Sequence, residues 1–123
     1  MIDVNKLRDA MQLVSAEKGD FVLFGLFLRE EAPDKWDLVV SAPWLEEGKL
    51  LALGEFIKKI TPIVGEQELL ALSRIITLNH DDPNLEAILR AFSVENGSLE
   101  LKDSTLFGMG IKRAYIIRAK RGA

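Results

Sequence analysis

The most constraining feature of the sequence is an unbroken apolar segment, residues 21–28, which is followed directly by charged residues. Its eight residues are far fewer than the ~20 that a helix needs to cross a bilayer. A short apolar run that ends in charge is typical of a β-strand buried on both faces. We therefore predict a strand over residues 21–30, in a protein whose helices pack against a sheet in two or three layers.

The composition sets the class of protein. The chain has 123 residues, 48% of them hydrophobic, which predicts one folded domain over residues 1–123 and argues against intrinsic disorder. Because cysteine is absent, disulfides, thiolate metal sites and cysteine nucleophiles are excluded. The first residues are charged every few positions and contain no apolar core of a signal peptide. These features predict a cytoplasmic protein without a membrane segment.

Turn and cap residues divide the chain into nine elements. Pro33, in the segment 31–35, predicts a turn between two antiparallel strands, and Asp82-Pro83 predicts a helix start. Pro62 is expected to end the helix before it, and Asn96-Gly97 predicts a tight turn. The predicted elements are a helix at 4–17, strands at 21–30 and 36–42, helices at 46–61 and 65–72, a strand at 73–78, a helix from Pro83 to about Phe92, and strands around 99–102 and at 114–119.

Helices and strands alternate irregularly in this order, and the first two strands are adjacent and antiparallel. The sequence therefore predicts an α+β fold, with a mixed sheet of about five strands, helices packed on it and the order α-β-β-α-α-β-α-β-β. The segment 107–113, which contains two glycines, predicts a bulge before the last strand, with a flexible loop whose backbone approaches a phosphate as the alternative. Trp36 and Trp44 are expected to lie in the core, with anchoring of a partner as the alternative.

His80 is the only histidine and lies between a predicted strand and a predicted helix. An imidazole titrates near neutral pH and binds metals, so His80 and Asp81 are candidate metal ligands and His80 is a candidate catalytic base. A structural interpretation competes with this one, because Asp82 is placed to cap the helix and Asp81 to interact with its dipole. The structural interpretation is the one that we favour.

A second set of candidates consists of Asp37, Glu47 and Lys49. Pro33-Asp34 followed by Glu47-Gly48-Lys49 resembles the motif of the restriction-endonuclease-like nucleases. That resemblance implies Mg²⁺ held by the acids and a lysine that assists the attacking water. In that family the Glu-x-Lys lies on a strand. Here it begins a segment with helical periodicity, whose predicted inward stripe consists of Leu50, Leu53, Ile57, Ile60 and Val64. Residues i and i+2 of a helix diverge, so a helix over 46–61 separates Glu47 from Lys49.

Residues 23–25 and 37–40 together resemble a minimal nucleotidyltransferase core, in which a Gly-Ser pair precedes an Asp-x-Asp on a strand. Leu26 stands at the position of the serine, and Lys35 at that of the first metal-binding acid. Both chemical elements of the family are replaced. The resemblance therefore implies at most an inactive relative.

The charge of the chain is unevenly distributed. Residues 1–103 contain 11 basic and all 19 acidic residues, whereas residues 104–123 contain five basic and no acidic residues. A basic end on an acidic body is typical of anion or nucleic-acid binding, but also of a basic strand packed beside acidic neighbours. We favour the second explanation. The candidate binding residues are Lys112, Arg113, Arg118, Lys120 and Arg121.

These patterns give three functional hypotheses. The first is a non-enzymatic interaction or regulatory domain without a cofactor, whose partner is a second copy of itself or another protein. The second is a metal-dependent phosphodiesterase that uses Asp37, Glu47 and Lys49. The third is nucleic-acid or anion binding through the basic end. The sequence favours the first hypothesis, because a large apolar inventory accompanies no convincing catalytic set.

Overall fold

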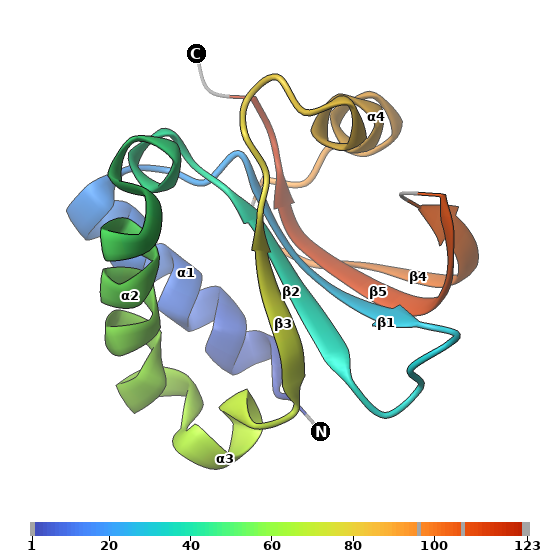
Figure 1. Ribbon diagram of the computed structural model, residues 1–123, viewed down its shortest axis with the longest axis horizontal. Helices are drawn as coiled ribbons and strands as arrows, with labels where there is room; N and C mark the ends of the chain where they lie inside the picture. Colours follow the sequence, from blue (N-terminus) through green and yellow to red (C-terminus); the bar gives the residue numbers. More distant parts are fainter. Residues whose placement is uncertain (1, 96, 107, 122–123) are drawn as a thin grey trace.

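A five-stranded mixed sheet with helices on both faces forms the centre of the molecule (Figure 1). The structure is a computed structural model that describes residues 2–95, 97–106 and 108–121. The strand order is β3-β2-β1-β5-β4, in which β2 and β3 are parallel and every other neighbouring pair is antiparallel. The strands are β1 (Leu23–Arg29), β2 (Trp36–Ser41), β3 (Leu72–Thr77), β4 (Leu99–Leu106) and β5 (Met109–Ala119).

The predicted fold class and element order are confirmed. The apolar run forms β1, which is buried along nearly its whole length and pairs with β2 on one side and β5 on the other. The β1–β2 pair is the predicted antiparallel hairpin. Asp82 caps the helix that starts at Pro83, with its side chain accepting a hydrogen bond from the Asn84 N–H at 2.8 Å.

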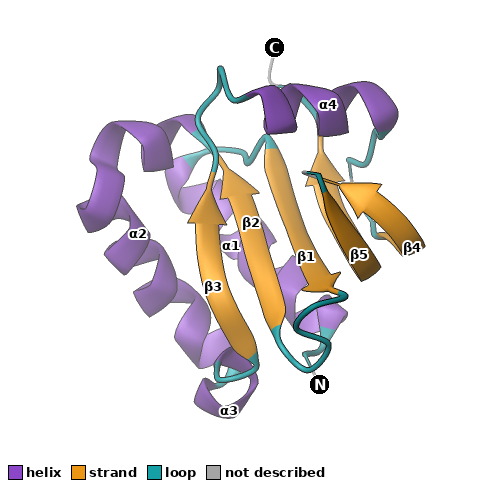
Figure 2. Ribbon diagram, turned by 45° about the vertical axis from the view of Figure 1, so that its right-hand side comes forward, coloured by secondary structure: helices purple, strands orange, loops and turns teal. Residues whose placement is uncertain are grey.

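The helices divide unequally between the two faces of the sheet (Figure 2). The N-terminal helices cover one face with a large apolar layer, at whose centre Phe21, Phe24 and Phe56 are fully buried. As far as the structure describes the chain, the opposite face receives one short helix, which inserts Leu85 and Ile88. The helices are α1 (Val4–Lys18), α2 (Pro43–Val64), α3 (Glu66–Leu69) and α4 (Pro83–Ala91).

The predicted bounds of the second helix are wrong at both ends. Helix α2 begins at Pro43 rather than near residue 46, because proline suits the first turn, where its missing N–H has no intrahelical partner. It also continues through Pro62 to Val64. Pro62 is tolerated because it lies in the last turn, where it removes one hydrogen bond just before the helix ends.

Helix α2 is also kinked at Lys49, whose backbone angles are φ 52° and ψ −130°. The kink changes the phase of the helix, so the predicted inward stripe is shifted. Leu50 was expected to face the core but is 82% exposed, and Leu51 is 88% exposed. The side chains that α2 does bury are Leu45, Ala52, Phe56, Ile60 and Val64.

We expect Lys49→Gly to stabilise the protein by about 1 kcal/mol, because residues with a side chain pay about 1–3 kcal/mol for such a conformation. The angles resemble the first central residue of a type II′ turn, a position that glycine fills without strain. Urea unfolding checks this as a higher midpoint with an unchanged slope. Lys49→Ala is the control, because it removes the charge and keeps the strain. Equal stability of the two variants would contradict the explanation.

The C-terminal hairpin differs from its prediction. Strand β5 begins at Met109 rather than 114, and Leu106 pairs with Met109, so Met109 and Gly110 lie within a regular β4–β5 pair. The pairing of β5 with β1 shifts register between Leu28 and Arg29 and passes over Lys112, so an irregularity does lie within the predicted segment. Two residues named in the sequence-based turns, Asn96 and Phe107, lie outside the described residues. Trp36 and Trp44 were expected to lie in the core, but both are only half-buried and pack against it from outside.

Candidate functional site

One carboxylate is buried in the sheet, on the face that carries only α4. Asp37 lies at the second position of β2, between Trp36 and Leu38, and is 2% exposed. Alternation along the strand places it on the same face as Val39, whereas Leu38 and Val40 face α1 and α2. A carboxylate so far from water requires charged or hydrogen-bonding partners.

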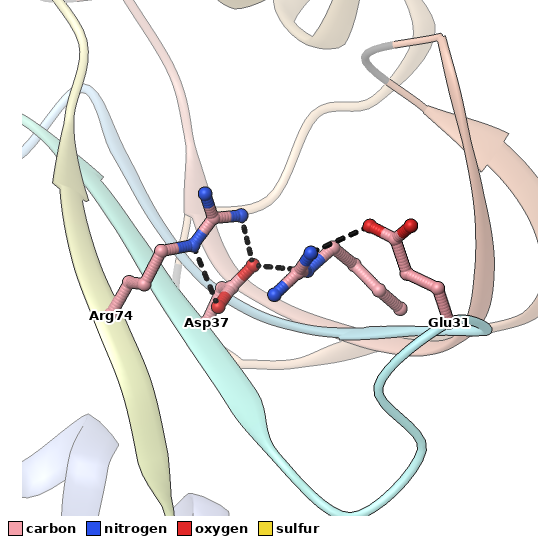
Figure 3. A network of polar contacts seen from close by, with 4 residues as sticks. Glu31, Asp37 and Arg74 are labelled. Atoms are coloured by element: carbon pink, nitrogen blue, oxygen red, sulfur yellow. Dashed lines mark hydrogen bonds and ion pairs between the residues drawn. The ribbon is translucent and has the colours of Figure 1, made fainter.

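Asp37 receives these partners from both neighbouring strands (Figure 3). Arg74, on β3, donates from Nη2 to Asp37 Oδ2 at 2.8 Å and from Nε to Oδ1 at 3.3 Å. Arg29, at the end of β1, places Nε 2.9 Å from Asp37 Oδ2. Its Nη1 donates to Glu31 at 2.6 Å. The result is a row of alternating charges across three strands.

The two arginines of the row share one buried anion, the Asp37 carboxylate. Asp37, which forms a forked hydrogen bond and an ion pair with Arg74, raises the pKa of that guanidinium above its usual range. Arg29 makes a poorer contact with Asp37. Its Nε is buried and lies close to Asp37, but the N–H makes no hydrogen bond among the described residues. One buried carboxylate is thus held by two guanidinium groups.

The row opens into a cavity of about 390 Å³ on this face of the sheet. Helix α4 is too short to cover the whole face, so the space beyond Leu85 and Ile88 is left open. The polar wall consists of the charged row and Asn84, in the first turn of α4. The apolar wall consists of Phe27, Val39, Ile76, Leu78, Met109 and Ile111.

Comparison of the chain with family models, curated proteins and solved structures finds no match. Only the geometry of the chain therefore bears on its function. Within the described ranges, no helix is long and apolar enough to span a bilayer.

Sequence reasoning included Asp37 among the candidates but missed Arg29 and Arg74. Both arginines flank or interrupt apolar strand sequence, as Asp37 does. Charges within buried strands are rare unless they are paired, and that signal could have grouped the three. It could not have chosen Arg74 among the other arginines, because the pairing depends on the parallel contact between β2 and β3.

The structure does not bring Asp37, Glu47 and Lys49 together. Asp37 lines the cavity on the sheet, Glu47 lines a hollow beside His80, and Lys49 lines a third hollow between α2 and the end of β3. In the part of the chain that the structure describes, no three His, Asp or Glu side chains gather in a way that could hold a metal ion.

His80 interacts with an acid from α2. Its Nδ1 lies 2.7 Å from Glu46 Oε1, and its backbone N–H donates to Glu46 Oε2 at 3.2 Å. The hydrogen bond and the charge of Glu46 raise the pKa of His80, with a contribution from Asp81, while Arg121 opposes the shift. The same hydrogen bond lowers the pKa of Glu46. The imidazole is 76% exposed, so the pair joins the loop after β3 to α2 without forming a buried site.

We expect the pKa of His80, measured by NMR titration, to lie above the ordinary value of about 6.5. Because the pKa is raised in the folded state, the stabilisation is complete below about pH 6.5 and is lost as pH rises through the raised pKa. Glu46→Gln should return the midpoint toward the ordinary value, and Glu47→Gln, which changes the next residue, should not. An identical midpoint in the wild type and Glu46→Gln would contradict the pairing.

Most of the basic C-terminal residues are paired with acidic residues. Arg118 donates to the Phe21 carbonyl at 2.5 Å and lies 3.7 Å from Asp20. The ion pairs of the others join Arg113 to Glu100, Lys120 to Glu95 and Arg121 to Glu86. Lys112 is exposed and lines a hollow with Lys102 and Arg113. This arrangement favours the structural explanation of the basic end, although β5 lies inside the sheet rather than at its edge.

A second surface is defined by strand β3, which lies at one edge of the sheet. Its N–H and C=O groups on the side away from β2 are free to pair, within the described chain, with another strand. Two hollows of about 200 and 220 Å³ lie between β3 and α2, one near each end of the strand. Two exposed leucines lie there: Leu50 on α2, which lines one hollow with Thr77 and Leu78, and Leu70, which is 75% exposed and lies just before β3. We call this surface the β3 edge.

Proposed function

We propose that this chain is a non-enzymatic interaction domain that pairs with a second copy of itself through the β3 edge. The observation that supports the proposal is the coincidence of an uncovered strand edge with exposed leucines and apolar hollows. Large exposed apolar side chains that lie together mark interaction surfaces. A cytoplasmic setting agrees with the absence of cysteine.

The β3 edge is complementary to itself. Leu78 donates its N–H to Val40 of β2, so alternation directs the N–H groups of Ile75 and Thr77 outward, up to the register shift opposite Trp36 and Asp37. An antiparallel pair with its two-fold axis at Ile75 places Arg74 of one copy opposite Ile76 of the other. In a two-fold interface the same surface of both copies meets, so each contact between two different residues occurs twice.

The same two-fold axis brings the exposed leucines of each copy toward the hollows of the other copy. Leu70 precedes β3, so antiparallel pairing carries it toward residues 77–79 of the second copy, which line one hollow. Leu50 lies at the other end of β3, beside Thr77 and Leu78, so the same pairing brings it toward the second copy's hollow around Ile57 and Leu72. Burying these side chains against each other removes apolar surface from water twice per dimer.

We expect size-exclusion chromatography with light scattering to show a dimer at micromolar concentrations that dissociates on dilution. Leu50→Lys should raise the dissociation constant at least about tenfold, because it places a charge in an apolar contact. Its side chain is 82% exposed in the isolated chain, so folding is unaffected. The matched control is Leu13→Lys, which changes an exposed leucine on α1, away from the β3 edge.

A second variant tests the strand pairing itself. Thr77→Pro removes an outward N–H while leaving the hydrogen bonds to β2 in place, as prolines in natural edge strands do. It should weaken the dimer as Leu50→Lys does. A chain that remains monomeric at every concentration, or equal weakening by Leu50→Lys and Leu13→Lys, would refute the proposal.

A further inference from the structure

We propose that the cavity on the α4 face binds a small amphipathic monoanion, a carboxylate joined to an apolar aliphatic body. The β3 edge and this cavity are different surfaces, and the inference does not depend on self-association. A cavity of about 390 Å³ falls within the range of small-molecule sites, about 300–1,000 Å³. Its walls divide into a charged end and an apolar end, as the sites of amphipathic ligands do.

The charge of the polar wall favours a single negative charge. Arg29 and Arg74 carry two positive charges against the one negative charge of buried Asp37. Glu31 meets Arg29 at the rim, where its side chain is 68% exposed and solvated, so it offsets the guanidinium charge less than buried Asp37 does. The inner part of the cavity therefore has a net positive potential, which a monoanion neutralises.

Each arginine of the row keeps an N–H group that makes no hydrogen bond to a described residue. Arg74 uses Nε and Nη2 on Asp37, so its Nη1 has no partner among the described residues. Arg29 uses Nη1 on Glu31, and its Nη2 likewise makes no hydrogen bond to a described residue. A guanidinium presents its N–H groups in a planar fork that matches a carboxylate. Asp37 thus holds the two guanidinium groups in place and leaves donors for a second carboxylate.

The apolar wall supplies the contact for the rest of the ligand. Ile76, Leu78 and Met109 are only partly buried by the chain, although they lie beside the fully buried Phe27 and Ile111. A flexible methionine next to aliphatic and aromatic side chains adapts to ligands of different outline. This wall therefore favours an aliphatic body rather than a polar one, such as a sugar.

The test uses octanoate as the probe, with octan-1-ol and acetate as matched compounds that lack the charge or the apolar body. Titration calorimetry should show octanoate binding at millimolar concentration or below, and at least about tenfold tighter than either matched compound. NMR of protein with labelled methionine methyl groups locates the binding. The Met109 signal should shift with octanoate, and the signal of Met11, which is buried under α1 on the opposite face, should not.

Arg74→Gln should weaken octanoate binding about tenfold or more, since it removes a charged donor. Asp37 keeps Arg29 as its partner, so the variant should fold, and its melting curve verifies this. Arg90→Gln makes the same change on α4 outside the cavity and should bind normally. The proposal is overturned if the Met109 signal does not move, if octan-1-ol binds as well as octanoate, or if the two arginine variants bind alike.

Discussion

Replacing Asp37 with asparagine should lower the free energy of unfolding by about 3 kcal/mol, the lower end of the cost of breaking a buried ion pair. Asparagine has nearly the same shape, so the change removes the charge and little else. Arg29 then keeps its positive charge in a site that is 16% exposed, without its main counter-ion. Arg74 is 46% exposed and recovers part of the loss from water, which places the cost at the lower end.

Chemical denaturation measures this effect, and thermal unfolding should show a midpoint lower by about 12 °C. Asp34→Asn is the control, because it makes the same change at an exposed position in the β1–β2 loop. Arg74→Met should cost less than Asp37→Asn, because Asp37 retains Arg29. If Asp37→Asn and Asp34→Asn are equally stable, the charged row does not stabilise the sheet.

Phe56→Ala should destabilise the protein by about 3–5 kcal/mol, because it removes a large buried ring and leaves a cavity. Phe56 is fully buried on α2, and its ring centroid lies 5.7 Å from that of Phe21 and 6.2 Å from that of Phe24. Trp44, at the start of α2, lies 6.3 Å away. These rings fix α2 to the sheet, so their loss also loosens the helix that carries Leu50 and Leu51.

Denaturant unfolding followed by tryptophan fluorescence measures this change. Ile57→Ala, one residue further along α2, is the matched control, because Ile57 is 37% exposed and should cost about 1 kcal/mol. Phe56→Leu keeps most of the apolar volume and should cost less than Phe56→Ala. A Phe56→Ala protein within 1 kcal/mol of the wild type would show that the aromatic cluster does not hold the helix.

The candidate sites were only partly visible in the sequence. Asp37 is conspicuous as a charge within an apolar strand, but its partner Arg74 lies 37 residues away. The exposure of Leu50 was predicted wrongly, because a regular helical period places it inside and the kink at Lys49 places it outside. The first pairing depends on a contact between strands that are distant in the sequence. The second outcome depends on the backbone angles of one residue, Lys49, which the periodicity of the segment does not predict.

The order and type of the elements were determined by the sequence itself. The apolar run of β1, the proline-containing turn to β2 and the Asp82-Pro83 helix start act over a few residues, so they are readable in any segment that contains them. Only the tertiary structure decided the strand order, the parallel contact between β2 and β3, and therefore the meeting of Asp37 with Arg74. Those features depend on which surfaces bury one another most favourably, a property of the whole chain that no local pattern records.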